Sequence, residues 1–128
     1  MKRVLVVEDD HEVNTLICRY LGQRSFHCDA AASAAQALTQ LEQPESPDLI
    51  LMDLELPDMD GAELCAEIRR RPDGSRIPVL VMTGYQQESQ LERFKASGVD
   101  DYLFKPFNPR ELLEKVNQMT EPSARTTA

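Results

Sequence analysis

The sequence predicts a single α/β domain, in which a parallel β-sheet is covered by helices on both faces. Short apolar segments alternate five times with segments of helical periodicity, and no internal repeat is present. Residues 49–52 are uniformly apolar and lead directly into Asp53, which is typical of a strand buried on both faces. A chain of 128 residues is long enough to bury a core without disulfides.

The expected strands are residues 2–7, 26–30, 48–53, 77–82 and 102–104. Each is a short run of mainly apolar residues followed by turn residues. Pro78 is acceptable only at the beginning of the fourth strand, because it cannot donate to the sheet. Thr83 and Gly84 are expected to end that strand.

The expected helices are marked by capping residues and by Gly or Pro at their ends. The first helix, between Asp10 and Gly22, has an apolar face formed by Val13, Leu16, Ile17, Tyr20 and Leu21. The others are a second helix from Ser33 to before Pro44, a third from Asp60 to before residues 72–74, a fourth over 87–97 and a fifth from Asn108 to Met119. The fourth has the thinnest apolar face, Leu91 and Phe94. We therefore expect one domain over residues 1–119, followed by a disordered tail or the beginning of a linker over residues 120–128.

The composition excludes several classes of function. A net charge of −8 argues against direct nucleic-acid binding. The sequence contains no run of about 18 apolar residues, so no membrane span is predicted, and the first residues are not expected to form a signal peptide. The three cysteines, Cys18, Cys28 and Cys65, lack a C-x-x-C pair and are expected to be reduced, as in a cytoplasmic protein.

Polar residues follow four of the expected strands. Glu8 and Asp9 follow the first, Asp53 ends the third, Thr83 follows the fourth and Lys105 follows the fifth. Because parallel strands end at one edge of the sheet, where ligands bind in open α/β folds, these side chains are expected to share a pocket. Singly, each has an ordinary explanation as a turn former or a helix cap.

The carboxylates of this pocket predict a magnesium site. Crowded carboxylates repel one another and shift their pKa values upward, and Mg²⁺ relieves that conflict through oxygen ligands. We expect Asp9 and Asp53 to bind the ion directly, Glu8 to act through water, and the backbone carbonyl of Glu55 to add a ligand. An aspartate can also attack a phosphoryl group and form an aspartyl-phosphate. Mg²⁺, Lys105 and the Thr83 hydroxyl would then neutralise the phosphoryl oxygens.

These residues are similar to those of a known family. The first acidic pair, the segment from residue 49 through Asp53 to Gly61, the strand before Thr83, and the segment from Gly98 through Lys105-Pro106 resemble the motifs of response-regulator receiver domains. The resemblance covers about residues 2–119, and its strength lies in the motifs' order and spacing together.

The resemblance implies a flavodoxin-like doubly wound five-stranded parallel sheet of order 2-1-3-4-5 with five helices. The first and fifth helices would cover one face and the second to fourth the other. It also implies a cis Lys105-Pro106 bond. Asp53 would be the phosphoacceptor, receiving phosphate from the phosphohistidine of a histidine kinase or histidine phosphotransfer protein with Mg²⁺ as the cofactor.

The resemblance further implies a conformational switch. Thr83 would move towards the phosphate and Tyr102 would turn inward, changing the surface of the fourth helix, fifth strand and fifth helix. That surface is also where a homodimer would form. The chain departs from the family at Phe104 and Gly84, which flank the pocket. It also carries Glu55 and Tyr85 at positions that tune dephosphorylation, and these predict slow hydrolysis.

Other interpretations remain open at this stage. A magnesium-dependent phosphatase with an aspartyl nucleophile requires a second aspartate two residues later, where this chain has Glu55. A receiver that acts as a phosphate-independent docking module would lack Asp53, Lys105 or the acidic pair. The output is also open, because the sequence is compatible with a stand-alone receiver or with part of a longer regulator.

Overall fold

The computed structural model describes residues 1–84 and 91–121. Its five strands form one parallel sheet in the order β2-β1-β3-β4-β5, as the resemblance implied. The strands are β1 (Lys2–Val7), β2 (Phe26–Ala31), β3 (Leu49–Asp53), β4 (Val79–Gly84) and β5 (Asp101–Lys105). Within the described residues the helices are α1 (His11–Gly22), α2 (Ala34–Gln40), α3 (Gly61–Arg69), α4 (Leu91–Ala96) and α5 (Pro109–Thr120), with a 3₁₀ turn η1 (Gly74–Arg76).

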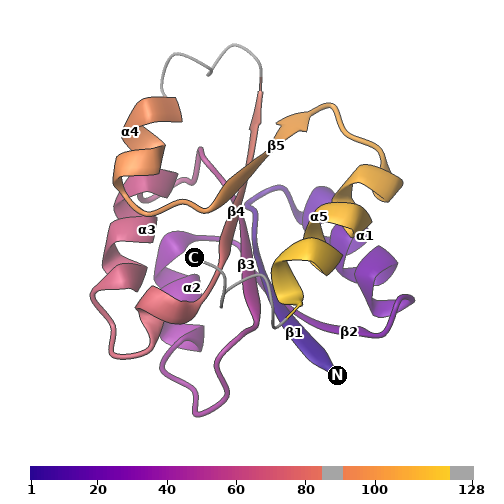
Figure 1. Cartoon of the computed structure of the whole chain (residues 1–128), viewed down its shortest axis with the longest axis horizontal. Coiled ribbons are helices and arrows are strands. Elements are labelled where there is room, and N and C mark those ends of the chain that lie inside the picture. The colour runs from indigo at the N-terminus through magenta and orange to yellow at the C-terminus, as the bar shows by residue number, and fades with distance from the viewer. Residues whose placement is uncertain (85–90, 122–128) are drawn as a thin grey trace.

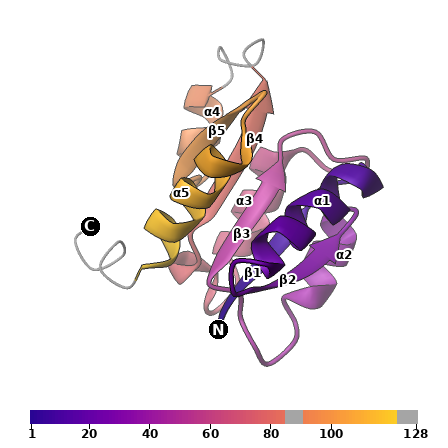
Figure 2. The ribbon, with the colours of Figure 1, turned by 90° about the vertical axis from the view of Figure 1, so that its right-hand side faces the viewer.

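The helices cover the two faces of the sheet as expected. Helices α1 and α5 lie on one face, and α2, α3 and α4 lie on the other (Figures 1 and 2). Successive residues of each central strand enter opposite cores: Leu5 and Ile50 pack with α2 and α3, whereas Val4 and Leu51 pack with α1 and α5. This explains why the central strands are continuously apolar, because neither face meets water.

Polar side chains begin four of the helices as the sequence predicted. Asp10 accepts hydrogen bonds from the backbone amides of Glu12 and Val13 at 3.0 and 3.3 Å. The remaining caps satisfy one backbone amide each at the beginning of their helices: Ser33 for α2, Asp60 for α3 and Asn108 for α5. These bonds fix where each chain segment turns from loop to helix.

Arg69 joins four segments on the α3 side of the sheet. Its guanidinium donates to the carbonyl oxygens of Gly74, Ile77 and Gly98 at 2.5, 2.8 and 2.7 Å. It also forms an ion pair with Asp100 at 2.9 Å. One side chain therefore connects α3, η1 and the segments that lead into β4 and β5.

Some boundaries differ from the sequence prediction. Strand β4 begins at Val79, after Pro78, and continues through Thr83 to Gly84, because both residues pair with β5. Helix α5 includes Thr120, which is 7% exposed, although the tail was expected to begin there. The structure does not describe residues 87–90, with which the fourth helix was predicted to begin, or residues 122–128. It also does not describe the side chains of Leu91 and Phe94, which were predicted to form the apolar face of that helix.

The apolar face predicted for α1 is also partly wrong. Leu16 is 62% exposed, and Asn14 is buried in its place, together with Ile17 and Leu21. The helix is therefore rotated about its axis relative to the prediction, with a polar side chain turned towards the sheet.

Candidate functional site: an acidic pocket at the carboxyl edge of the sheet

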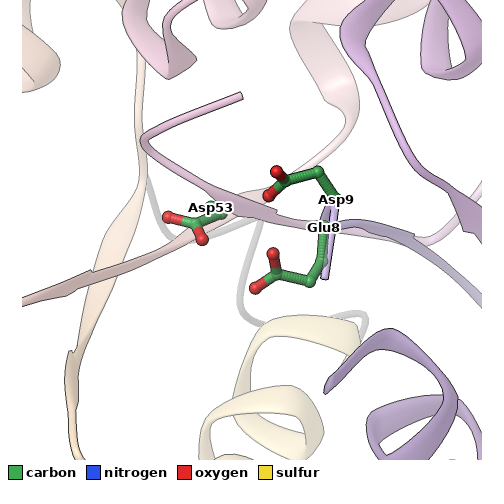
Figure 3. Close-up of side chains that lie close together, drawn as sticks. All are labelled: Glu8, Asp9 and Asp53. Carbon is green, nitrogen blue, oxygen red and sulfur yellow. The ribbon is translucent and has the colours of Figure 1, made fainter. Parts of the chain in front are cut away.

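Three carboxylates from two neighbouring strands meet at the carboxyl edge of the sheet. Glu8 and Asp9 follow β1, and Asp53 is the last residue of β3. The strands are in register there, because Val7 pairs with Met52. Each residue offers a carboxylate oxygen, and these atoms all lie within 4.8 Å of one another (Figure 3). The sequence therefore predicted this cluster correctly.

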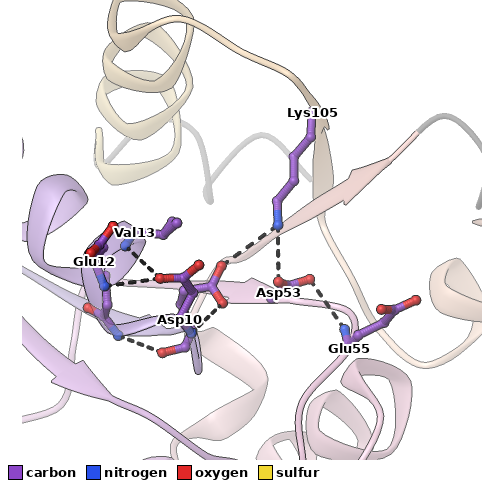
Figure 4. A network of polar contacts seen from close by, with 8 residues as sticks. Asp10, Glu12, Val13, Asp53, Glu55 and Lys105 are labelled. Carbon is purple, nitrogen blue, oxygen red and sulfur yellow. Dashed lines mark hydrogen bonds and ion pairs between the residues drawn. The ribbon is translucent and has the colours of Figure 1, made fainter.

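Lys105 places a positive charge in the same pocket. It ends β5, where it pairs with Gly84, and its bond to Pro106 is cis, as expected. The ammonium lies 3.0 Å from Asp53 Oδ2 and 3.7 Å from Glu8 Oε1 (Figure 4). It thereby links the carboxylates that end β1 and β3 from a strand at the edge of the sheet.

Both oxygens of Asp53 have partners. Oδ2 accepts from Lys105, and Oδ1 accepts from the backbone amide of Glu55 at 3.3 Å (Figure 4). The Asp53 side chain is 14% exposed, and it faces an open pocket of about 500 Å³. The lining residues are Glu8, Asp9, Asp10, Val13, Asp53, Glu55, Leu56, Pro57 and Lys105. The carboxylate is thus held in one orientation at the floor of a site that a small anion can enter.

The pocket shifts the pKa values of its buried groups. The pKa of Glu8 is raised to about 7, mainly by burial and also by the charge of Asp53, against the opposing effects of the Asp10 amide and Lys105. Burial alone would lower the pKa of Lys105. Its hydrogen bond to Asp53 and the charges of Asp53 and Glu8 outweigh burial, so that the pKa of Lys105 is raised. Lys105 is therefore a stable cation beside a glutamate, Glu8, that burial makes costly to ionise.

The hard oxygen ligands of this cluster suit a divalent cation such as Mg²⁺. Within residues 1–84 and 91–121, Glu8, Asp9 and Asp53 form a group whose carboxylates are close enough together to share one ion. Glu55 lines the pocket, and the role of its carbonyl as a ligand stays a prediction.

Thr83 and Tyr102 are not among the residues that line the pocket. Thr83 is fully buried in β4, one residue beyond Met82, which pairs with Asp53. Its hydroxyl donates to the carbonyl of Gly84 at 3.3 Å. Tyr102 is half-buried in β5 and packs against the core on the α2–α3 side. Tyr85, which was predicted to affect hydrolysis, lies outside the described residues.

The sequence analysis missed Asn14, which holds the ends of two strands. Its amide nitrogen lies 3.0 Å from the carbonyl oxygen of Glu8, 3.2 Å from that of Ala31 and 3.3 Å from that of Val6. The side chain is 4% exposed. Asn14 falls three residues before Ile17 and seven before Leu21, and therefore lies on the same helix face as these buried residues. A polar residue at a position where the helical period predicts burial was the signal that could have revealed Asn14.

Asp58 was the second omission. Its two carboxylate oxygens each accept from a backbone amide of α2, those of Ala34 and Ala35, at 2.9 Å. These bonds lower the pKa of Asp58. A residue of the loop after the pocket therefore caps a helix more than twenty residues earlier in the chain, which no local sequence pattern indicates.

Comparison with known proteins identifies the family to which this chain belongs. Residues 4–117 match the family model described as the response regulator receiver domain. The chain belongs to the response regulator receiver family. One curated relative is the phosphate regulon transcriptional regulatory protein PhoB of Rhizobium meliloti, which is 34% identical over 93% of this chain and 52% of its own length.

Solved structures share the whole fold with this receiver domain. A response regulator from Chloroflexus aurantiacus has a TM-score of 0.86 and 32% identity, and it covers 93% of this chain and 97% of its own. The chemotaxis response regulator CheY4 of Vibrio cholerae has a TM-score of 0.87 and 27% identity over 93% of this chain and 98% of its own. The receiver chain spans about half the length of the PhoB relatives from Rhizobium meliloti and Escherichia coli. Among its described residues no helix has both the length and the apolar character needed to cross a membrane.

Proposed function

We propose that this receiver accepts a phosphoryl group on Asp53 from the phosphohistidine of a histidine kinase or histidine phosphotransfer protein, in a reaction that depends on Mg²⁺. The observation that carries the proposal is the fixed position of Asp53. Its Oδ2 is 3.0 Å from Lys105, and its carboxylate lies beside those of Glu8 and Asp9 at an open pocket. The domain would catalyse only its own phosphorylation and a slow dephosphorylation.

Asp9 and Asp53 would bind the magnesium ion directly and Glu8 would bind it through water, with the Glu55 carbonyl as a further ligand. The ion supplies positive charge against the oxygens of the transferring phosphoryl group. Glu8 must lose its proton to hold a metal-bound water as a carboxylate, because its pKa is raised to about 7. Metal binding by this receiver is therefore expected to strengthen as the pH rises through that value.

Asp53 acts as the nucleophile, and Lys105 acts as the fixed cation. One carboxylate oxygen of Asp53 attacks phosphorus while the bond from phosphorus to the donor nitrogen breaks. Lys105 is already in contact with Asp53 and can move to a phosphoryl oxygen without leaving the pocket. Its raised pKa keeps it protonated throughout this exchange. No general base is required when the nucleophile is a carboxylate oxygen.

Phosphorylation would change the surface formed by α4, β5 and α5. Thr83 lies on the strand next to Asp53, and Tyr102 pairs with Val81 in the neighbouring strand. Movement of Thr83 towards the phosphate would let Tyr102 turn further inward, and the altered surface would contact an output partner or a second copy. Thr83→Ala with a phosphoryl mimic at Asp53 tests this coupling. An unchanged response of the α4–β5–α5 surface in that variant would contradict it.

The phosphoacceptor is tested by intact mass after incubation with Mg²⁺ and a small phosphodonor. The wild type should gain one phosphoryl group, and Asp53→Asn should gain none. Asp58→Asn is the matched control, because this carboxylate lies in the loop that follows Asp53, accepts from the amides that begin α2 and does not line the pocket. No gain by the wild type with several donors and a kinase, or an equal gain by Asp53→Asn, would reject the proposal.

A further inference from the structure

Two of the cysteines lie where α1 packs on β2, on the same side of the sheet. The side chains of β2 alternate between the two faces, and Cys28 shares the α1 side with Phe26. On α1, Cys18 lies one turn after Asn14, on the flank that contacts the sheet. Both cysteines pack against the same core, and both are half-buried, whereas Cys65 is fully buried on the opposite side.

From this arrangement we infer that Cys18 and Cys28 form a modification site, a thiol pair that is oxidised reversibly to an intramolecular disulfide. The site lies outside the acidic pocket, and its oxidation does not require phosphorylation at Asp53. Disulfides in reducing compartments are usually transient and regulatory. Cys18 and Cys28 are both partly exposed, so a soluble oxidant or reductant can reach them.

The electrostatics of the pair assign different roles to the two sulfurs. A hydrogen bond from the Cys28 thiol lowers the pKa of Cys18, against burial and the charge of Asp29. The same bond raises the pKa of Cys28, and burial raises it further. Cys18 is therefore the better thiolate and the attacking group, and Cys28 is the resolving thiol.

An organic disulfide such as oxidised glutathione is the co-reactant. The Cys18 thiolate attacks one sulfur of that disulfide, and one glutathione leaves as a thiol after taking up a proton. Cys28 then loses its proton, its sulfur attacks Cys18 of the mixed disulfide, and the second glutathione leaves. The two protein thiols lose two electrons and two protons in total, and one glutathione disulfide becomes two thiols.

The pair also contacts the scaffold of the pocket. The Cys18 thiol donates to Asn14 Oδ1 at 3.4 Å, and the amide of Asn14 holds the carbonyl of Glu8. A disulfide sulfur has no proton to donate, so oxidation removes this bond from Asn14. The modification would thereby reach the residue that positions the first acidic pair.

The test treats the full chain with increasing ratios of oxidised to reduced glutathione, unfolds it in the presence of an alkylating agent and measures the intact mass. The reduced protein carries three alkyl groups, one on each cysteine. We expect the oxidised protein to carry one alkyl group and to be two hydrogens lighter, and dithiothreitol should restore all three. Three alkyl groups at every ratio, a persistent glutathione adduct, or dimers joined by disulfides would each overturn the inference.

Serine variants locate the bond. Cys65→Ser should keep the disulfide, whereas Cys18→Ser and Cys28→Ser should lose it. The serine at position 18 retains a donor for Asn14, which protects the fold. In the Cys65→Ser protein, trypsin cuts after Arg19 and Arg24, between the two remaining cysteines. Their peptides should stay joined until reduction, and separate peptides before reduction would contradict the assignment.

Discussion

Replacing Asn14 with leucine should loosen the strand ends that carry the first acidic pair. Leucine has a similar size, but it cannot donate to the carbonyl oxygens of Glu8, Ala31 and Val6. The Ala31 carbonyl keeps a bond from the backbone amide of Glu8 at 3.0 Å. A buried carbonyl left without its donor costs about 1–3 kcal/mol, so we expect a loss of about 2 kcal/mol in the free energy of unfolding.

Urea unfolding followed by circular dichroism, with a chelator present, measures this loss without a contribution from bound metal. With a slope of roughly 1–3 kcal/mol per molar urea, 2 kcal/mol lowers the midpoint by about 1 M. Asn117→Leu is the matched control, because Asn117 is exposed on α5 and should shift the midpoint little. If Asn14→Leu unfolds at the same urea concentration as the wild type, the amide does not hold these strand ends and the reasoning fails.

Three further predictions concern stability. Gly74→Ala places a Cβ 1.6 Å from a backbone carbonyl oxygen of α3 and should destabilise the domain by about 2 kcal/mol or more, whereas Gly22→Ala has open space and should stabilise it by about 0.5–1 kcal/mol in the same urea assay. Arg69→Met removes three hydrogen bonds to carbonyl oxygens and one ion pair with Asp100, whose carboxylate keeps its bond from the Val79 amide, and should cost about 2–4 kcal/mol. Arg70→Met removes an exposed ion pair and should change stability by less than about 1 kcal/mol; equal effects would contradict the role of Arg69. Folding raises the pKa of Glu8 from 4.5 to about 7, so between these pH values the folded protein retains a proton that the unfolded chain has lost. In the absence of metal, the free energy of unfolding should therefore fall by up to about 3 kcal/mol as the pH rises from 4.5 to about 7. Glu8→Gln should flatten that pH profile, and an identical slope in both proteins would contradict the assignment.

The sequence was sufficient to predict the parallel sheet and to predict which residues meet at its carboxyl edge. Parallel strands must end at one edge, so Glu8, Asp9, Asp53 and Lys105 could be brought together from their positions alone. Helix caps were equally accessible, because a cap bonds to the turn that follows it.

The sequence was not sufficient for features that depend on distant parts of the chain. The rotation of α1, which exposes Leu16 and buries Asn14, is set by carbonyl groups of β1 and β2. The four bonds of Arg69 likewise depend on loops that come together only in the folded domain. Neither residue interrupts a local pattern strongly enough to indicate its partners.

The bonds of Asp58 give the segment after Asp53 a particular mechanical property. The segment is fastened at its beginning by the amide of Glu55, in its middle by Asp58 on α2, and at its end by the bond from the Gly61 amide to the Leu54 carbonyl at 2.8 Å. It is therefore joined to the beginning of α2 as well as to the end of β3. A displacement of this segment that starts at Asp53 would have to break these bonds or carry the beginning of α2 with it.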